Sequence, residues 1–110
     1  MAYDQELAAR IRAHVGDRPG LTEQKMFGGL AFLLGGHMAV AASGQGGLLV
    51  RVEPAQTEAL LAEPGAAPME MGGRGPMKGW LQVAPAVLDD ATLRAWVDRG
   101  VRYAGTLPPK

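Results

Sequence analysis

The stretch of sequence that decides the fold is KMFGGLAFLLGGHM, at residues 25–38. Its apolar residues run up to Gly35-Gly36 and begin again after it, and a glycine pair easily supplies the positive φ of a tight hairpin. We therefore predict two antiparallel strands, at residues 24–34 and 37–42. Gly28-Gly29 falls inside the first strand, where glycine commonly marks a bulge or the close approach of another backbone.

A third strand and a second hairpin follow from the same kind of pattern. Leu48, Val50 and Val52 alternate with other residues after a glycine-rich turn, as expected for a strand with one buried face. Further along, apolar runs at residues 67–71 and 77–83 bracket a second glycine-rich turn. The pattern therefore predicts a three-stranded meander followed by a two-stranded hairpin.

Three helices are predicted around these strands. The first covers residues 3–15, where apolar residues recur at helical spacing. The second covers residues 55–62, since Pro54 suits a first helical position. The third follows Asp89, a typical N-cap residue, and continues to Ala104. The resulting order, αβββαββα, predicts an α+β fold of two layers, with helices against one mainly antiparallel sheet.

The composition indicates one small domain that spans residues 1–110. Eleven basic residues balance eleven acidic ones, so long-range attraction to nucleic acid is missing and direct nucleic-acid binding is disfavoured. There is no cysteine, which excludes disulfides, thiolate nucleophiles and cysteine-based metal sites. Charged residues interrupt the N-terminus, and no apolar run approaches about 18 residues. We therefore expect no signal peptide, no membrane segment and a cytoplasmic location.

No set of residues in the sequence predicts catalysis. The glycine pairs lack the following helix and the placed lysine of a phosphate-binding loop. His14 and His37 are the only histidines of the sequence, and neither has partners at the spacing of a metal site or a general base. The hydroxyl residues lack a nucleophile-elbow context. We therefore predict no catalytic residue, no metal site and no cofactor.

Four basic residues form the best local candidate for a binding site. Lys25, Arg51, Arg74 and Lys78 each lie in or beside a predicted strand, on the phase opposite its most apolar residues. Their convergence would create a modest cationic patch for a partner or an anionic ligand. The alternative is that they solvate the edges of the sheet or pair with acidic side chains, as surface charges usually do.

Three apolar residues are candidates for an interface. Phe27, Leu49 and Trp80 alternate against the residues expected to face the helices, so they would form an apolar patch on the other side of the sheet. We predict a homodimer or a partner complex that buries Trp80 and leaves Lys25, Arg51 and Lys78 near its rim. The alternative reverses the phase of these strands and puts Trp80 beneath a helix, since a one-residue shift exchanges the two faces.

The predicted hydrophobic core is single and lies between the helices and the sheet. Its members recur at helical spacing in the first and third helices and alternate in the strands. They are Leu7, Ile11, Leu30, Phe32, Val50, Val52, Leu81, Val83, Leu93, Trp96 and Val97.

Several segments of the chain, taken in order, resemble the TfoX/Sxy N-terminal domain family. They are KMFGG at residues 25–29, LVRV at 49–52, GRGPMKGW at 73–80, and Trp96-Val97 with Tyr103-Ala104 and Leu107-Pro108. The resemblance covers essentially the whole chain. It implies the two-layer α+β arrangement of type III secretion chaperones, with the order αβββαββα.

The same resemblance implies regulation rather than catalysis. In the competence regulators that name the family, the domain belongs to a transcriptional coactivator described as working with the cyclic-AMP receptor protein. Since the sequence ends at Lys110 without a C-terminal domain, we expect a stand-alone regulatory or protein-interaction domain that is not an enzyme. The resemblance makes the transcription machinery a candidate partner. The alternative is a small enzyme or an anionic-ligand-binding module that uses His37, Arg51 or Lys78.

Overall fold

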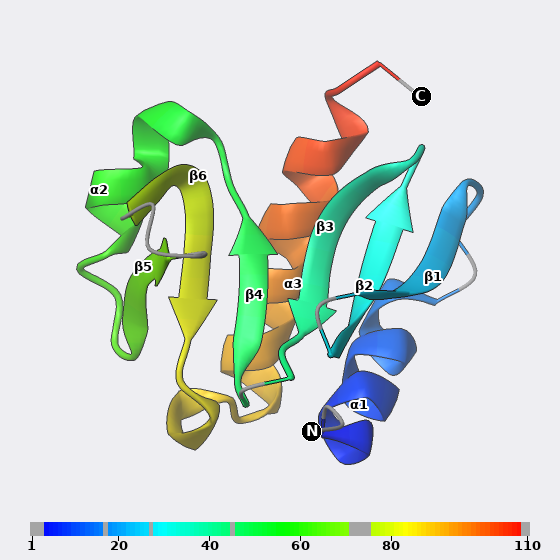
Figure 1. Ribbon diagram of the computed structural model, residues 1–110, viewed down its shortest axis with the longest axis horizontal. Helices are drawn as coiled ribbons and strands as arrows, with labels where there is room; N and C mark the ends of the chain where they lie inside the picture. The colour runs from blue at the N-terminus through cyan, green and yellow to red at the C-terminus, as the bar shows by residue number, and fades with distance from the viewer. Residues whose placement is uncertain (1–3, 17, 27, 45, 71–75, 109–110) are drawn as a thin grey trace.

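The computed structural model describes residues 4–16, 18–26, 28–44, 46–70 and 76–108. In this part of the chain, six strands form one antiparallel sheet in the order β1-β2-β3-β4-β6-β5 (Figure 1). The strands are β1 (Leu21–Met26), β2 (Gly29–Leu34), β3 (His37–Ala42), β4 (Leu48–Arg51), β5 (Ala66–Glu70) and β6 (Pro76–Val83). The helices are α1 (Gln5–Val15), α2 (Thr57–Leu60) and α3 (Asp90–Gly105), with short 3-10 helices η1 (Pro54–Gln56) and η2 (Pro85–Val87). None of the helices in the described residues is long and apolar enough to cross a membrane.

Helices α1 and α3 cover one face of the sheet. In Figure 1 α3 lies behind β3 and β4, on which it packs, and α1 packs beside α3. The main hydrophobic core fills the space between these helices and the sheet, because the apolar stripes of the helices meet alternate residues of the strands. All eleven predicted core residues belong to it. The predicted α+β class is therefore confirmed.

Each of the two long helices begins at a capping aspartate. Asp4 Oδ1 accepts hydrogen bonds from the backbone N–H groups of Glu6 and Leu7, at 2.9 Å and 3.2 Å. Asp89 Oδ1 accepts one from Thr92 at 2.8 Å. These carboxylates satisfy donors that the first helical turn leaves unpaired. The N-cap predicted at Asp89 is confirmed.

The strand predicted at residues 24–34 is two strands. β1 ends at Met26, Gly28 has a φ of +76° in the turn, and β2 begins at Gly29. The sequence hides β1 because this edge strand is mostly polar and exposed, so hydrophobic alternation does not reveal it. The meander therefore has four strands. The expected close approach is confirmed, since a β-carbon at Gly29 would overlap the carbonyl oxygen of Ala42.

The helix predicted at residues 55–62 is shorter and has two parts. Pro54 occupies the first position of η1, as expected, and α2 then continues only to Leu60. Gly65, with a φ of +77°, turns the chain back toward the sheet and limits the length of the segment.

A second apolar cluster lies on the face of the sheet opposite α1 and α3, which we call the outer face. Ala31, Leu33 and Ala41 are buried there, and Met38 and Leu49 pack against them while remaining partly exposed. The prediction of a single core is therefore wrong. Strand alternation gives the sheet two apolar faces, and the helices cover only one of them.

Candidate functional site

The outer face carries an apolar cluster that α1 and α3 leave uncovered. Side chains at paired positions of antiparallel strands share a face, so Ala31, Ala41, Leu49 and Gln82 follow one another across β2, β3, β4 and β6. Leu49, one of the predicted interface residues, thus lies in the middle of this face. Phe27, another of them, is outside the described residues.

Trp80 lies on the same face, beside this cluster. It pairs across the strands with Arg51, whose Cζ lies 5.3 Å from the centroid of the Trp80 ring. Its strand neighbours Leu81 and Val83 are buried in the main core, so alternation places Trp80 on the outer face. The arrangement with Trp80 beneath a helix is therefore excluded, and the ring is partly exposed.

Hydrogen bonds fix the backbone that precedes Trp80. Gly79 has a φ of +86°; its N–H donates to Thr57 Oγ1 at 2.8 Å, and its carbonyl accepts from the Val52 N–H at 2.8 Å. The Thr57 hydroxyl donates in turn to the carbonyl of Pro54 at 2.9 Å. These bonds join the η1–α2 segment to β6, so they hold Trp80 in place relative to β4.

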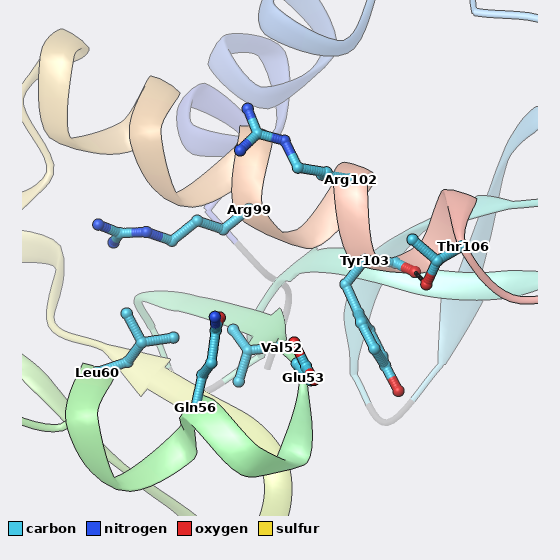
Figure 2. Close-up of a pocket in the computed structure, with 8 residues that line it drawn as sticks. All are labelled: Val52, Glu53, Gln56, Leu60, Arg99, Arg102, Tyr103 and Thr106. Atoms are coloured by element: carbon cyan, nitrogen blue, oxygen red, sulfur yellow. Dashed lines mark hydrogen bonds between the residues drawn. The ribbon is translucent and has the colours of Figure 1, made fainter.

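A cleft of about 230 Å³ lies between α3 and the η1–α2 segment (Figure 2). Val52 and Leu60 provide apolar walls, whereas α3 contributes two arginines and a tyrosine. The complete lining is Val52, Glu53, Gln56, Leu60, Arg99, Arg102, Tyr103 and Thr106. Basic side chains therefore outnumber acidic ones around the cleft, although the whole chain has no net charge.

Tyr103 connects this cleft to Arg51. The Cζ atom of Arg51 lies 5.7 Å from the centroid of the Tyr103 ring, so Arg51 contacts aromatic rings from both β6 and α3. Arg99 is held differently. Its Cζ lies 4.6 Å from the centroid of the Trp96 ring, and its guanidinium lies 3.8 Å from a carboxylate oxygen of Glu63.

The structure does not bring Lys25 and Arg51 together into the predicted cationic patch. Lys25 pairs with Leu30, a position that faces the helices, whereas Arg51 follows the outer-face phase of β4. Two strands, β2 and β3, also separate them. Arg74 and the side chain of Lys78 are outside the described residues. Of these four, Arg51 is the residue that the structure places in a defined environment of aromatic rings.

Sequence reasoning missed the residues that surround Arg51 and the cleft. Arg99, Arg102, Tyr103 and Thr106 recur at i, i+3, i+4 and i+7, so they form one polar stripe on α3 beside its buried stripe. The stripe itself was visible in the sequence. Nothing in the sequence indicated that the η1–α2 segment would lie opposite it.

A second hollow lies between the end of α1 and the start of β1, and an ion pair forms part of its lining. Arg12 donates from Nε and from a terminal nitrogen to the two carboxylate oxygens of Glu23, at 2.7 Å and 2.8 Å. Hydrogen bonding from Arg12 holds the pKa of Glu23 below its usual value of 4.5. Because these charges satisfy each other, this hollow does not indicate a ligand site.

The fold and these surfaces define a small α+β domain with an apolar outer sheet face and a basic cleft at one end. In the described part of the chain, no group of three or more histidine and acidic side chains could hold a metal ion. The model of the TfoX N-terminal domain family matches residues 13–104, so the chain belongs to this family. No curated protein and no solved structure gives a significant match.

Proposed function

We propose that this TfoX N-terminal domain is a regulatory protein-interaction domain rather than an enzyme, and that its outer face binds a second copy of the chain. The observation that carries the proposal is the apolar cluster that includes Leu49, on a face that α1 and α3 leave open and that Trp80 shares. Partly exposed apolar side chains grouped on one face are typical of protein contact surfaces.

A second copy is the best-supported partner because the centre of this face is neutral. Its described members are apolar or uncharged, and Arg51 is at one end of β4. In a two-fold dimer each patch lies against its own copy, so a charged centre would repel itself whereas an apolar one would not. Arg51 would then be placed near the rim, where water reduces the cost of its charge.

The enzymatic alternative has weaker support. A catalytic site would require an enclosed pocket in which His37, Arg51 or Lys78 meets an acidic partner. In the part of the chain that the structure describes, the linings of the two hollows above contain neither His37 nor Arg51, and the side chain of Lys78 lies outside the described residues. His37 Nε2 instead lies 2.6 Å from the carbonyl oxygen of Pro108, at the C-terminal end of the described residues.

Light scattering across a concentration series tests the proposed contact. The unmodified protein should form dimers. The Leu49→Glu variant should remain folded but stay monomeric, because a dimer would have to bury the new carboxylate in its contact. Ala95→Glu is the matched control, since it adds the same charge to an exposed position of α3. A protein that is monomeric at every concentration, or a Leu49→Glu variant that still dimerises, would contradict the proposal.

The regulatory role needs a separate experiment. Deleting the gene should change the levels of specific transcripts. Reintroducing the gene with the Leu49→Glu substitution should fail to return these transcripts to their normal levels. Affinity capture with the intact protein should recover transcription-related proteins. Unchanged transcripts together with no such partner would count against regulation, whatever the oligomeric state.

A further inference from the structure

Arg51 is a partly buried cation for which the described residues supply no anion. Arg51 has no ion pair and no hydrogen-bond acceptor, as far as the described residues show, whereas Arg10, Arg12 and Arg99 each have an acidic partner. Removing a guanidinium from water is costly unless something compensates for the lost hydration. The compensation that the described structure provides is a pair of aromatic rings, whose centroids lie 5.3 Å (Trp80) and 5.7 Å (Tyr103) from Arg51 Cζ.

Contact with aromatic rings orients a guanidinium without using its hydrogen bonds. The attraction acts between the cation and the faces of the rings, so the N–H donors of Arg51 stay available for an acceptor. Trp80 is fixed through the Gly79 and Thr57 hydrogen bonds, and Tyr103 extends from the long helix α3. Much of the ordering cost of an arginine–anion contact has therefore been met before an anion arrives.

The surroundings of Tyr103 favour an anion. The same tyrosine that contacts Arg51 lines the cleft that Arg99 and Arg102 also line. Arg102 has no ion pair within the described residues. The cleft also has apolar walls, so it can receive a carbon body attached to a charged group.

We infer that Arg51, held against Trp80 and Tyr103, is a binding site for a carboxylate, with the adjoining cleft receiving part of the molecule that carries it. A carboxylate matches a guanidinium in charge and in geometry, because two parallel N–H···O bonds join them. A phosphate fits less well. It needs more cations, Arg99 is already paired with Glu63, and Glu53 at the cleft would repel a second negative charge.

The carboxylate has two sources that the chemistry of the site does not distinguish, a free organic acid and an acidic side chain or chain end of a peptide. The site consists of residues of one chain only, so carboxylate binding does not require self-association. It can therefore be measured on the unmodified protein at concentrations too low for dimers to form.

Titration with defined probes tests the site. The probes are sodium acetate, sodium phenylacetate and a short Asp/Glu peptide, with sodium phosphate for comparison and sodium chloride at matched ionic strength. The readouts are the NMR resonance of the Arg51 Nε–H group and the fluorescence of Trp80. The Trp80→Phe variant shows which part of the protein fluorescence comes from Trp80. A saturable response to the carboxylates and not to chloride is expected, with phosphate weaker at equal concentration.

The variants separate a specific site from general attraction to positive charge. Arg51→Gln should weaken carboxylate binding about tenfold or more, as expected for loss of a charge-assisted hydrogen-bonded pair. Arg51→Lys should weaken carboxylate binding less than Arg51→Gln, since lysine keeps the positive charge and loses only the two parallel N–H donors of the guanidinium. Arg94→Gln, at an exposed position of α3, removes the same charge and should leave binding unchanged.

Three results would overturn the inference. They are a linear response that never saturates, equal binding by Arg51→Gln and the unmodified protein, and tighter binding of phosphate than of every carboxylate. If phenylacetate binds more tightly than acetate, the carboxylate comes from a free organic acid whose carbon body enters the cleft. If only the peptide saturates and Arg51→Gln removes its binding, the source is an acidic segment. Circular dichroism checks that Arg51→Gln folds, and Arg51→Lys provides the comparison if it does not.

Discussion

Replacing Gly100 by alanine tests how closely α3 lies on the sheet. Gly100 is buried in the middle of this helix. The pairing of β2 with β3 shifts register between Phe32 and Leu33, which leaves Ala39 as a bulge beneath the helix. A β-carbon at position 100 would overlap the carbonyl oxygen of Ala39 and lie 2.9 Å from Val40 Cγ1. The glycine therefore allows the helix backbone to rest on the strand backbone.

Two effects oppose each other in Gly100→Ala. Alanine in a helix interior is more favourable than glycine by about 0.5–1 kcal/mol. Against this, overpacking a well-filled core costs roughly 1–3 kcal/mol. The upper part of that range applies here, because a backbone carbonyl cannot rotate away as a flexible side chain can. We expect the strain to win, with a net loss of about 1–2 kcal/mol, which lowers the melting temperature by roughly 5–10 °C.

Urea and thermal denaturation followed by circular dichroism measure this loss. Gly105→Ala is the matched control, because Gly105 ends the same helix and its β-carbon would meet only Leu34 Cδ2, at 3.5 Å. The control should be as stable as the unmodified protein or slightly more so. If Gly100→Ala were equally stable, helix propensity would dominate and the close approach of α3 to Ala39 would be wrong.

Three further substitutions test the core, the backbone before Trp80 and the ion pair near α1. Trp96→Ala should cost about 3–5 kcal/mol, since Trp96 is 1% exposed in the main core; an unchanged melting temperature would refute its burial. Thr57→Val should cost about 1–3 kcal/mol because it leaves the buried Gly79 N–H without an acceptor, whereas Thr57→Ser should keep most of the stability, and calorimetry compares the two. Glu23→Gln removes the carboxylate that pairs with Arg12. Because Arg12 lowers the pKa of Glu23, this pair stabilises the folded protein above the usual pKa of 4.5, and its contribution is lost as the pH falls through the lowered pKa. The free energy of unfolding of the unmodified protein should therefore exceed that of the variant by about 0.5 kcal/mol near neutral pH, and the two values should become equal in acid. Urea titrations at several pH values measure this difference.

The core was predictable because its residues lie in strongly periodic segments. In α3 the apolar stripe is continuous from Leu93 to Ala104, and in β4 and β6 the alternation is unambiguous. β1 was missed for the converse reason. An edge strand with exposed polar side chains contributes little to the core, so its strand character comes from backbone pairing with β2, which the side-chain pattern does not record.

The candidate site was predictable only in part. Alternation within a strand groups side chains that share a face, so the sequence could group Leu49 and Trp80 together, but it left open which of the two faces the helices cover. It does not tell which strands are neighbours. The order β1-β2-β3-β4-β6-β5 places β6 with Trp80 beside β4 with Arg51, and it puts β2 and β3 between these strands and β1 with Lys25. Strand order depends on packing between segments distant in the sequence, which local patterns do not contain.

Arg51 links the two surfaces of the domain because of where β4 ends. Its position along the strand assigns it to the outer face with Trp80, yet its guanidinium also contacts Tyr103 from the helix layer. The charge of Arg51 therefore lies next to both the apolar outer face and the tyrosine that lines the cleft. By thermodynamic linkage, a carboxylate bound at Arg51 changes self-association only if its affinity differs between monomer and dimer, and self-association then changes carboxylate affinity by the same factor. A rim position for Arg51 makes such a difference physically reasonable, since a second copy would alter its exposure to water.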